Sequence, residues 1–219
     1  MGSKILELGY QSSSNNAENR LHSFNFLIKE GDLVSIYGRN GSGKSAILNN
    51  LMGIDRIKDF FCTFNGKNLS SSSTEDMVKH GFAYIPQRDF VNPILTVSEF
   101  LELPYFFGKN KHNNYALKDA ISIWGEDSFL NREEQLCGNL SGGEKKILAL
   151  LRAFINKPEV IVIDDFAANL SVESMLRLEK LFEYYLNSGG IILLASEMGS
   201  YNSALGRKYI IEEFEVKVF

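Results

Sequence analysis

Short apolar runs alternate along this chain with longer stretches in which apolar residues recur at helical spacing. Three runs are almost wholly apolar and predict strands that are buried on both faces, at 33–37, 160–163 and 191–194. Shorter or alternating runs predict further strands at 4–8, 24–28, 60–64, 82–85 and 210–219. Helical spacing predicts helices after Gly43 and after Ser171. Buried strands that alternate with helices indicate an α/β sheet with helices on both faces.

The middle of the chain, from residue 88 to residue 157, shows a different pattern. Its apolar residues recur mostly at helical spacing, and Thr96 with Glu99 has the spacing of a capping box at the start of one helix. We therefore expect a single domain in which 1–87 and 158–219 form one core, with 88–157 as a helical insertion.

The composition limits the size, the charge and the compartment. A chain of 219 residues, 44% hydrophobic and 23% charged, is long enough for a large domain with a real core. Its net charge of −4 argues against a broad basic surface for nucleic acid. Cys62 and Cys137 are expected to be buried and reduced. Since no apolar run approaches the roughly 18 residues of a membrane span, we expect a cytoplasmic protein that reaches a membrane only through a partner.

One segment matches a complete phosphate-binding motif. It reads Gly38-Arg39-Asn40-Gly41-Ser42-Gly43-Lys44-Ser45, which fits G-x-x-x-x-G-K-[ST], and it stands between a predicted strand and a predicted helix. In such a loop the glycines allow a tight turn, and the backbone amides and the helix start form a nest for phosphate oxygens. Lys44 would supply positive charge to the β- and γ-phosphates, and the Ser45 hydroxyl would ligate Mg²⁺. The motif predicts binding of Mg-ATP through Gly38, Asn40, Gly41, Ser42, Gly43, Lys44 and Ser45.

A second motif indicates a family. The run Leu140-Ser141-Gly142-Gly143-Glu144 resembles the signature of ABC ATPases, the nucleotide-binding subunits of ABC transporters. The chain also shows that family's motifs in order: phosphate loop, Q-loop, signature, Walker B, D-loop and H-loop. Ser141 and Glu144 have capping-box spacing as well, and both interpretations hold together because a capped helix start points amides at an anion. The resemblance implies that Ser141, Gly143 and Glu144 contact ATP held by a facing subunit.

The resemblance also implies a fold and partners. The fold is a P-loop NTPase with a RecA-like α/β core formed by 1–87 and 158–219, an antiparallel β subdomain, and an inserted α-helical signature subdomain at 88–157. The partners are a transmembrane permease subunit and a second ABC ATPase subunit, without nucleic acid, at the inner face of the cell membrane. Within the family, the signature, Asn169-Leu170 and Glu102-Leu103-Pro104 look most similar to ATPases of lipoprotein-release, macrolide-export and cell-division complexes.

The resemblance assigns further residues to the site. Gln87 stands at the Q-loop position and is implied to contact Mg²⁺ and water, while Asp164 ends Walker B and is implied to hold Mg²⁺ through water. With Ser45 they form the implied metal set. Tyr10 stands where the family often carries an aromatic residue that stacks on adenine, and a structural strand-end tyrosine is the alternative. Ala46 replaces a common threonine next to Ser45 in the nucleotide-binding loop.

The chain departs from the family at positions linked to hydrolysis. Asp165 follows Walker B where a glutamate usually polarises the attacking water, and its side chain is about 1.5 Å shorter. Ser196 is assigned to the H-loop histidine position and Ser171 to the D-loop aspartate position, where it also suits a helix cap. A misplacement near 1 Å costs about a hundredfold in rate. We therefore predict normal binding of Mg-ATP and slow hydrolysis, with Lys44, Gln87, Asp165 and Ser196 as catalytic residues.

Two functions stay open at this point. In the first, the chain is the ATP-binding subunit of an ABC transporter and couples ATP binding and hydrolysis to a membrane partner. In the second, it is a degenerate or regulatory subunit that uses ATP as an assembly clamp and completes a partner's active site. The first predicts ATPase activity from the chain itself, and the second predicts stimulation when the chain is mixed with its partner.

Overall fold

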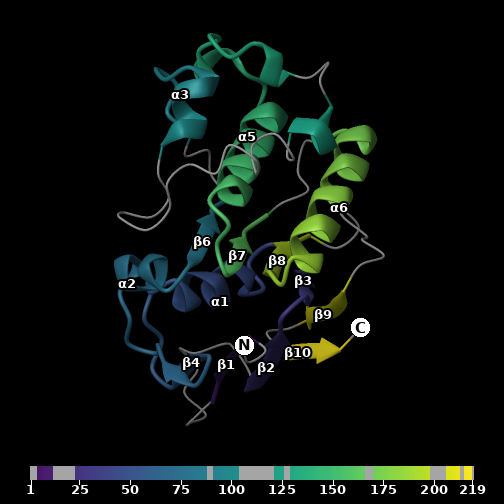
Figure 1. Cartoon of the computed structure of the whole chain (residues 1–219). Coiled ribbons are helices and arrows are strands. Elements are labelled where there is room, and N and C mark those ends of the chain that lie inside the picture. The colour runs from purple at the N-terminus through teal and green to yellow at the C-terminus, as the bar shows by residue number, and fades with distance from the viewer. Residues whose placement is uncertain are drawn as a thin grey trace.

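The computed structural model describes residues 4–11, 23–87, 91–103, 121–125, 129–165, 170–197, 206–212 and 215–218. These residues form two sheets and a set of helices (Figure 1). The larger sheet has the strand order β10-β9-β3-β8-β7-β6, and all its neighbouring pairs are parallel except β9 with β10. Its strands are β3 (Leu33–Gly38), β6 (Phe82–Ile85), β7 (Val160–Ile163), β8 (Ile191–Ser196), β9 (Arg207–Glu212) and β10 (Glu215–Val218).

The C-terminal strand prediction needs a correction. The sequence pattern predicts one alternating strand from Ile210 to Phe219, whereas the structure has two strands that pair antiparallel, with Glu212 opposite Glu215. β9 begins earlier, at Arg207, because it pairs in parallel with β3 from Val34 onward. Alternation continues across both strands of a hairpin, so the apolar pattern alone does not reveal the point where the chain reverses.

The smaller sheet is antiparallel and has the order β2-β1-β4-β5. Asn65 and Gly66 join β4 to β5 with positive φ angles of 51° and 77°, which is the geometry of a two-residue hairpin turn. This pair therefore reverses the chain between the two strands. Its strands are β1 (Ile5–Tyr10), β2 (Phe24–Lys29), β4 (Phe60–Phe64) and β5 (Lys67–Asn68).

Serine and threonine caps begin most of the described helices. The side chains of Ser73, Thr96, Ser141 and Ser171 each accept a hydrogen bond from a backbone N–H in the first helical turn, which satisfies one of the donors left open there. The capping boxes predicted at Thr96 and Ser141 are present. The helices are α1 (Lys44–Leu51), α2 (Thr74–Lys79), α3 (Val97–Glu102), α5 (Gly142–Ile155) and α6 (Val172–Asn187), with 3₁₀ turns η1 (Phe129–Asn131) and η2 (Cys137–Asn139).

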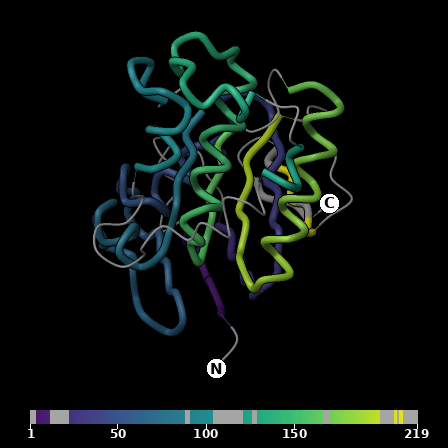
Figure 2. The backbone as a smooth tube through the Cα atoms, turned by 45° about the horizontal axis from the view of Figure 1, so that its top comes forward, coloured from purple at the N-terminus to yellow at the C-terminus, as the bar shows by residue number. Residues whose placement is uncertain are grey.

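The larger sheet separates two hydrophobic cores. Alternate residues of β7 point to opposite faces, so Ile161 and Ile163 pack with α5 and α6, while Val160 and Val162 pack with α1 and the antiparallel sheet. Figure 1 shows α5 and α6 on one side of the sheet and α1 on the other, and Figure 2 shows α5 and α6 side by side. The sheet is therefore covered on both faces, as the unbroken apolar runs predict.

The predictions for the two cysteines are confirmed, whereas the predicted subdomain boundaries are not tested. Cys62 and Cys137 are buried and free, one in each core, as predicted. Between 88 and 157 the described residues are mainly helical, with one isolated bridge between Thr96 and Leu136. The subdomain boundaries at 87 and 158 stay predictions.

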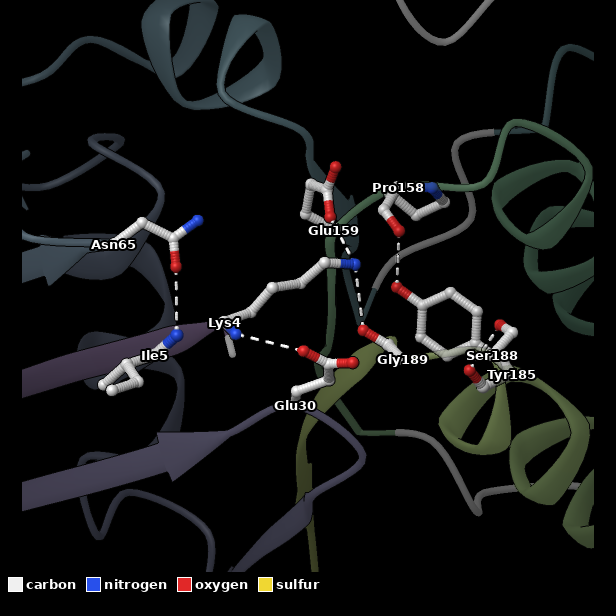
Figure 3. A network of polar contacts seen from close by, with 9 residues as sticks. All are labelled: Lys4, Ile5, Glu30, Asn65, Pro158, Glu159, Tyr185, Ser188 and Gly189. Carbon is white, nitrogen blue, oxygen red and sulfur yellow. Dashed lines mark hydrogen bonds and ion pairs between the residues drawn. The ribbon is translucent and has the colours of Figure 1, made fainter. Parts of the chain in front are cut away.

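A polar network fixes the edge of the larger sheet where β7 and β8 begin (Figure 3). Lys4 Nζ lies 2.6 Å from a carboxylate oxygen of Glu159 and donates to the carbonyl oxygen of Gly189 at 3.0 Å. The Tyr185 hydroxyl on α6 donates to the carbonyl oxygen of Pro158 at 2.8 Å, and this bond is buried. The antiparallel sheet and α6 are thereby fastened to one edge of the parallel strands, and the opposite edge carries the site.

Candidate nucleotide-binding site

A cavity of about 300 Å³ opens at the carboxyl ends of β3, β7 and β8. The loop after β3 forms one wall, and the residues that follow β6, β7 and β8 form the others. In an open parallel sheet this edge is where ligands bind. The lining residues are Asn40, Gly41, Ser42, Gly43, Lys44, Ser45, Ala46, Gln87, Asp164, Asp165 and Glu197.

The loop between β3 and α1 turns tightly because two of its glycines adopt left-handed conformations. Gly41 has φ of 81° and Gly43 has φ of 100°, which are angles that other residues adopt at a cost. Ser42 N–H donates to the Arg39 carbonyl at 3.2 Å and closes the turn. Gly43 is the N-cap of α1 and supplies no capping side chain, so the amides at the start of α1 stay open toward the cavity. This is the geometry of an anion nest.

The Lys44 ammonium is held inside the loop. Its Nζ donates to the carbonyl oxygens of Gly38 at 2.8 Å and Arg39 at 2.9 Å, and the residue is only 7% exposed. Burial lowers the pKa of Lys44, while the negative charges of Glu197 and of two aspartates oppose that shift. A compact positive charge is therefore fixed where a phosphate chain would lie along the loop.

The Ser42 hydroxyl gives an independent indication of an anion. Its Oγ is buried in the loop and has no hydrogen-bond partner among the described residues. A buried hydroxyl without a partner costs free energy, so such a group in a native fold calls for an explanation. A phosphate oxygen bound in the nest would accept a hydrogen bond from this hydroxyl, and the loop therefore fits the nucleotide that the motif predicts.

Ser45 at the start of α1 and Asp164 after β7 lie together in the cavity. Asp164 is 4% exposed, and this burial raises the pKa of its carboxyl group, while a hydrogen bond from Ser45 opposes the rise. One hydroxyl, one carboxylate and the nearby Gln87 amide are oxygen donors that suit Mg²⁺, which is usually held by one or two carboxylates together with substrate phosphates. The predicted metal residues are thus gathered in one cavity, and their roles stay predictions.

A tyrosine that interacts with Asp164, and the asparagine that it contacts, do not follow from the motifs. The Tyr84 hydroxyl on β6 donates to Asn49 Oδ1 on α1 at 3.0 Å, and this bond is partly buried. Burial and the charge of Asp164 raise the pKa of Tyr84, so the phenol stays protonated beside the carboxylate. The pair joins the sheet to the helix that carries the phosphate loop. Neither residue belongs to a phosphate-binding pattern, so the sequence offers no signal for this contact.

Gln87 and Asp165 are brought into direct contact. Gln87 Nε2 donates to Asp165 Oδ2 at 3.0 Å although the two residues lie far apart in the chain. Asp165 has a left-handed backbone, with φ of 48°, which aspartate tolerates better than most residues. Lys146 Nζ on α5 donates to the Asp165 carbonyl oxygen. Lys146 belongs to none of the sequence motifs, yet it links α5, which begins with the signature residues, to the candidate water-activating residue.

The residue assigned to the H-loop histidine position does not line the described cavity, and its catalytic role stays a prediction. Ser196 is the last residue of β8, has no exposed surface and is absent from the described cavity lining. The residue that lines the cavity after β8 is Glu197. The apolar run that defines the strand ends at Ala195, so the sequence gives no sign that Ser196 continues the ladder opposite Tyr37. The side chain beyond the strand end is therefore a carboxylate.

The signature residues form the start of α5 rather than part of this cavity. Ser141 caps the helix, and Glu144 completes the capping box by accepting from Ser141 N–H at 2.8 Å. Arg132 lies 2.5 Å from Glu144, and the capping bonds and Arg132 lower its pKa against the effect of burial. Ser141, Gly143 and Glu144 are not among the residues that line the cavity around Lys44. Their contact with a facing subunit's nucleotide stays a prediction.

Two further sequence assignments lie outside the cavity. Tyr10 is 4% exposed in β1, and its ring centroid lies 6.5 Å from that of Phe24. The structure thus leaves little ring surface free for an adenine, and stacking by Tyr10 stays a prediction. Ser171 caps α6, which is the helix-cap role that the sequence also predicts for it. Residues 166–169, which include Asn169 of the D-loop stretch, lie outside the described residues.

A strand, a glycine-rich loop that encloses a lysine, a helix, and a buried aspartate after β7, which β8 separates from β3, define a P-loop nucleoside triphosphatase. The comparison with protein families gives a narrower result. The model of the family described as ABC transporter matches residues 21–168, more than half of the chain. The chain therefore belongs to the ABC transporter family. It is an ATP-binding subunit, and ATP hydrolysis is the activity of the family.

Two curated relatives are named for transport of amino acids. The chain is 25% identical over 193 residues to the high-affinity branched-chain amino acid transport ATP-binding protein BraG of Pseudomonas aeruginosa, which covers 88% of this chain and 82% of that protein. It is 32% identical over 145 residues to the probable branched-chain amino acid transport ATP-binding protein LivF of Archaeoglobus fulgidus, covering 66% of this chain and 60% of that protein. These relatives do not support the narrower likeness to lipoprotein-release, macrolide-export or cell-division ATPases.

Solved structures confirm the fold. The ADP conformation of MJ1267, an ATP-binding cassette of an ABC transporter, aligns with a TM-score of 0.78 at 19% identity and covers 98% of this chain and 89% of that chain. An ATP-binding subunit of an ABC transporter aligns with a TM-score of 0.80 at 22% identity, covering 97% and 88%. The predicted P-loop NTPase core with an antiparallel sheet is therefore confirmed. Among the described helices, none is both long and apolar enough to cross a bilayer.

Proposed function

We propose that this chain binds Mg-ATP between the Gly38–Ser45 loop and Asp164, and that its nucleotide binding drives a membrane transport partner. The observation that carries the proposal is the loop itself. Lys44 is buried against two loop carbonyls, the Ser42 hydroxyl has no partner among the described residues, and the amides of α1 face the cavity. These three features are the donors that a polyphosphate requires.

Mg²⁺ would be held by Ser45 and Asp164, with Gln87 as a further oxygen ligand. When bound, it would neutralise phosphate charge. The chain's own groups would position the nucleotide: Lys44 along the phosphates and the amides of α1 around them. Asp165 would orient the attacking water, and the Gln87 amide would hold that carboxylate in place through the 3.0 Å hydrogen bond.

Hydrolysis at this site is proposed to be slow. The Asp165 carboxylate is about 1.5 Å closer to its own backbone than a glutamate carboxylate would be. Its left-handed backbone is fixed by the Lys146 contact, so the main chain does not easily move to compensate. Positioning errors of this size lower rates by about a hundredfold.

The complete catalytic site is proposed to form between two subunits. Ser141 and Gly143 lie at the start of α5, where amides and the helix dipole favour an anion. Since these residues do not line the chain's own phosphate cavity, a nucleotide on a second ABC ATPase subunit is the anion that they would serve. Closure of such a pair on ATP would transmit force to a transmembrane permease subunit at the inner face of the membrane.

The named relatives direct the choice of transport role. Both are ATP-binding proteins of branched-chain amino acid transport, so we favour uptake of a small solute of that kind over lipoprotein release or macrolide export. Contacts with the cargo would be made by the membrane subunit. The chain offers the nucleotide site and the coupling surface.

A second candidate function is favoured by the altered residues at 165 and 196. A chain that binds ATP, hydrolyses it poorly and still carries Ser141 to Glu144 could complete the active site of a fuller ATPase partner and use its own ATP as a clamp. The two functions predict different ATP turnover when the chain is mixed with a partner ATPase. The clamp function predicts that adding the partner ATPase stimulates turnover and that the Asp165→Asn variant supports this stimulation as well as the unchanged chain.

Binding of Mg-ATP by the purified chain tests the main proposal. Equilibrium binding and size-exclusion chromatography are run with and without Mg-ATP on the wild type, on Lys44→Ala, and on Lys180→Ala as a control at an exposed position of α6. We expect the wild type and Lys180→Ala to bind ATP and to form a larger species with it, and Lys44→Ala to lose most of its affinity. Equal ATP affinity of Lys44→Ala and the wild type would contradict the proposal.

A further inference from the structure

Glu197 is the first residue after β8, and the strand register places it at the phosphate edge of the sheet. β8 lies between β3 and β7, with Ser196 opposite Tyr37 and Leu194 opposite Ile163. Each of these neighbouring strands ends at this level and continues into the site. Glu197 therefore lines the same cavity as the phosphate loop and Asp164.

This position gives the cavity an unusual charge for a site that receives a polyanion. Among the lining residues the structure describes, one ammonium, that of Lys44, faces three carboxylates, those of Asp164, Asp165 and Glu197. With all four groups ionised the formal charge is −2. Of the three carboxylates, Glu197 has the largest electrostatic effect on Lys44. The Lys44 ammonium, which would bind the phosphates, thus also interacts with the Glu197 carboxylate, and this carboxylate would repel the phosphates.

Asp164 and Asp165 have assigned roles toward the metal and the water, and Glu197 has none. A carboxylate beside a phosphate chain raises the free energy of binding unless a cation lies between the two. The repulsion grows with the charge of the nucleotide, so it acts more strongly on a triphosphate than on a diphosphate. It is partly relieved when a divalent cation neutralises the phosphates.

We propose that Glu197 makes the site depend on a divalent cation, by weakening the binding of metal-free ATP. The inference rests on the proposed function of Mg-ATP binding at the Gly38–Ser45 loop. Glu197 acts as a specificity-determining residue: it disfavours a bare triphosphate, and the metal complex of ATP escapes most of this penalty. The side chain thereby selects the form of the nucleotide that the subunit binds.

The size of the effect follows from Coulomb's law. One carboxylate a few ångströms from a phosphate, in the partly solvated mouth of a cavity, changes affinity by about five- to tenfold. We expect removal of the charge to increase the affinity for metal-free ATP by this factor. The affinity for metal-free ADP should rise by about two- to threefold, and the affinity for Mg-ATP by less than twofold. The ratio between the metal-free and the metal-bound affinities is the diagnostic quantity.

The experiment uses the full chain and the Glu197→Gln variant, which keeps the shape of the side chain and removes its charge. The control is Glu183→Gln on the exposed side of α6, which changes the net charge equally. Dissociation constants for ATP and ADP are measured by displacement of a fluorescent nucleotide, in EDTA and in saturating Mg²⁺. Circular dichroism checks the fold, and Glu197→Ala repeats the measurement if the glutamine variant folds poorly.

We expect Glu197→Gln to bind metal-free ATP more tightly than the wild type, and Glu183→Gln to bind it with the affinity of the wild type. Unchanged or weaker metal-free ATP binding by Glu197→Gln would overturn the inference, as would a loss of turnover at constant affinity, since that would make Glu197 a catalytic carboxylate. Failure of the proposed function looks different. A wild type that binds no ATP in Mg²⁺ refutes both, whereas normal Mg-ATP binding that depends on Lys44 leaves the proposed function intact and isolates the failure to Glu197.

Discussion

The length of the side chain at position 165 offers the sharpest mechanistic prediction. The change is Asp165→Glu, which adds one methylene and carries the carboxylate about 1.5 Å farther from the backbone. In the present structure the Asp165 Oδ2 accepts from Gln87 Nε2 at 3.0 Å, and the backbone at this residue is left-handed, with φ of 48°. The variant therefore changes the reach of the carboxylate while the main chain stays fixed by Lys146.

Two opposite effects set the expected magnitude. If the short side chain misplaces the carboxylate by about 1 Å or more, correcting it raises the rate of hydrolysis by up to about a hundredfold. Glutamate tolerates a left-handed backbone less well than aspartate, so we expect a loss of about 0.5–1 kcal/mol in the free energy of unfolding. For a chain of this size such a loss lowers the melting temperature by about 1–4 °C.

The assay is release of inorganic phosphate at saturating Mg-ATP, with differential scanning fluorimetry on the same samples. Asp165→Asn is the matched control, because it keeps the size and the backbone preference and removes the charge. We expect faster turnover and a lower melting temperature for Asp165→Glu, and for Asp165→Asn retained ATP binding with residual turnover abolished.

Two outcomes would refute the reasoning. A glutamate variant that binds ATP normally and turns over no faster would show that the length of this side chain is not what limits hydrolysis. An asparagine variant as active as the wild type would show that the Asp165 carboxylate takes no part in the reaction. In either case the slow hydrolysis would have to be explained by Glu197 or by the absence of a second subunit.

Two further predictions concern the neighbours of Asp165. Because burial raises the pKa of Asp164 in the fold, Asp164→Asn should increase stability at pH 7 without nucleotide by up to about 1 kcal/mol. The folded wild type takes up its proton at a higher pH than the unfolded chain, so this advantage should shrink as the pH falls from 7 toward 4; urea unfolding at several pH values would show it, and a less stable variant at pH 7 would contradict it. Lys146→Met should lower phosphate release by about tenfold with little change in ATP affinity, since it removes the donor to the Asp165 carbonyl. An unchanged rate in Lys146→Met would show that this contact does not position the residue.

Local signals made much of the fold predictable. The unbroken run at Val160–Ile163 predicts a strand buried on both faces, and the structure divides its alternate residues between the two cores. Capping residues such as Ser141 act within one turn of their own helix, so spacing alone identifies them. The phosphate loop is equally local, because its glycines, its lysine and the helix that follows are contiguous in the chain.

The rest of the site depends on contacts that spacing does not encode. The hydrogen bond from Tyr84 to Asn49 joins β6 to α1, and the Lys146 contact joins α5 to Asp165, the second residue after β7. Such pairs can be predicted only when the order of the strands in the sheet is known. The burial of Ser196 and the place of Glu197 in the cavity lining have the same origin, since the end of β8 is set by its ladder with β3 rather than by hydropathy.

The turnover of ATP by the isolated chain tests the central claim most directly. Purified protein is mixed with radiolabelled Mg-ATP, and bound ATP, bound ADP and released phosphate are measured over time in one sample. We expect ATP bound through Lys44, with a turnover near or below about 0.1 per second, about a hundredfold below the median of enzymes. Unaided turnover of about several ATP per second would contradict the account, and so would a chain that binds no ATP.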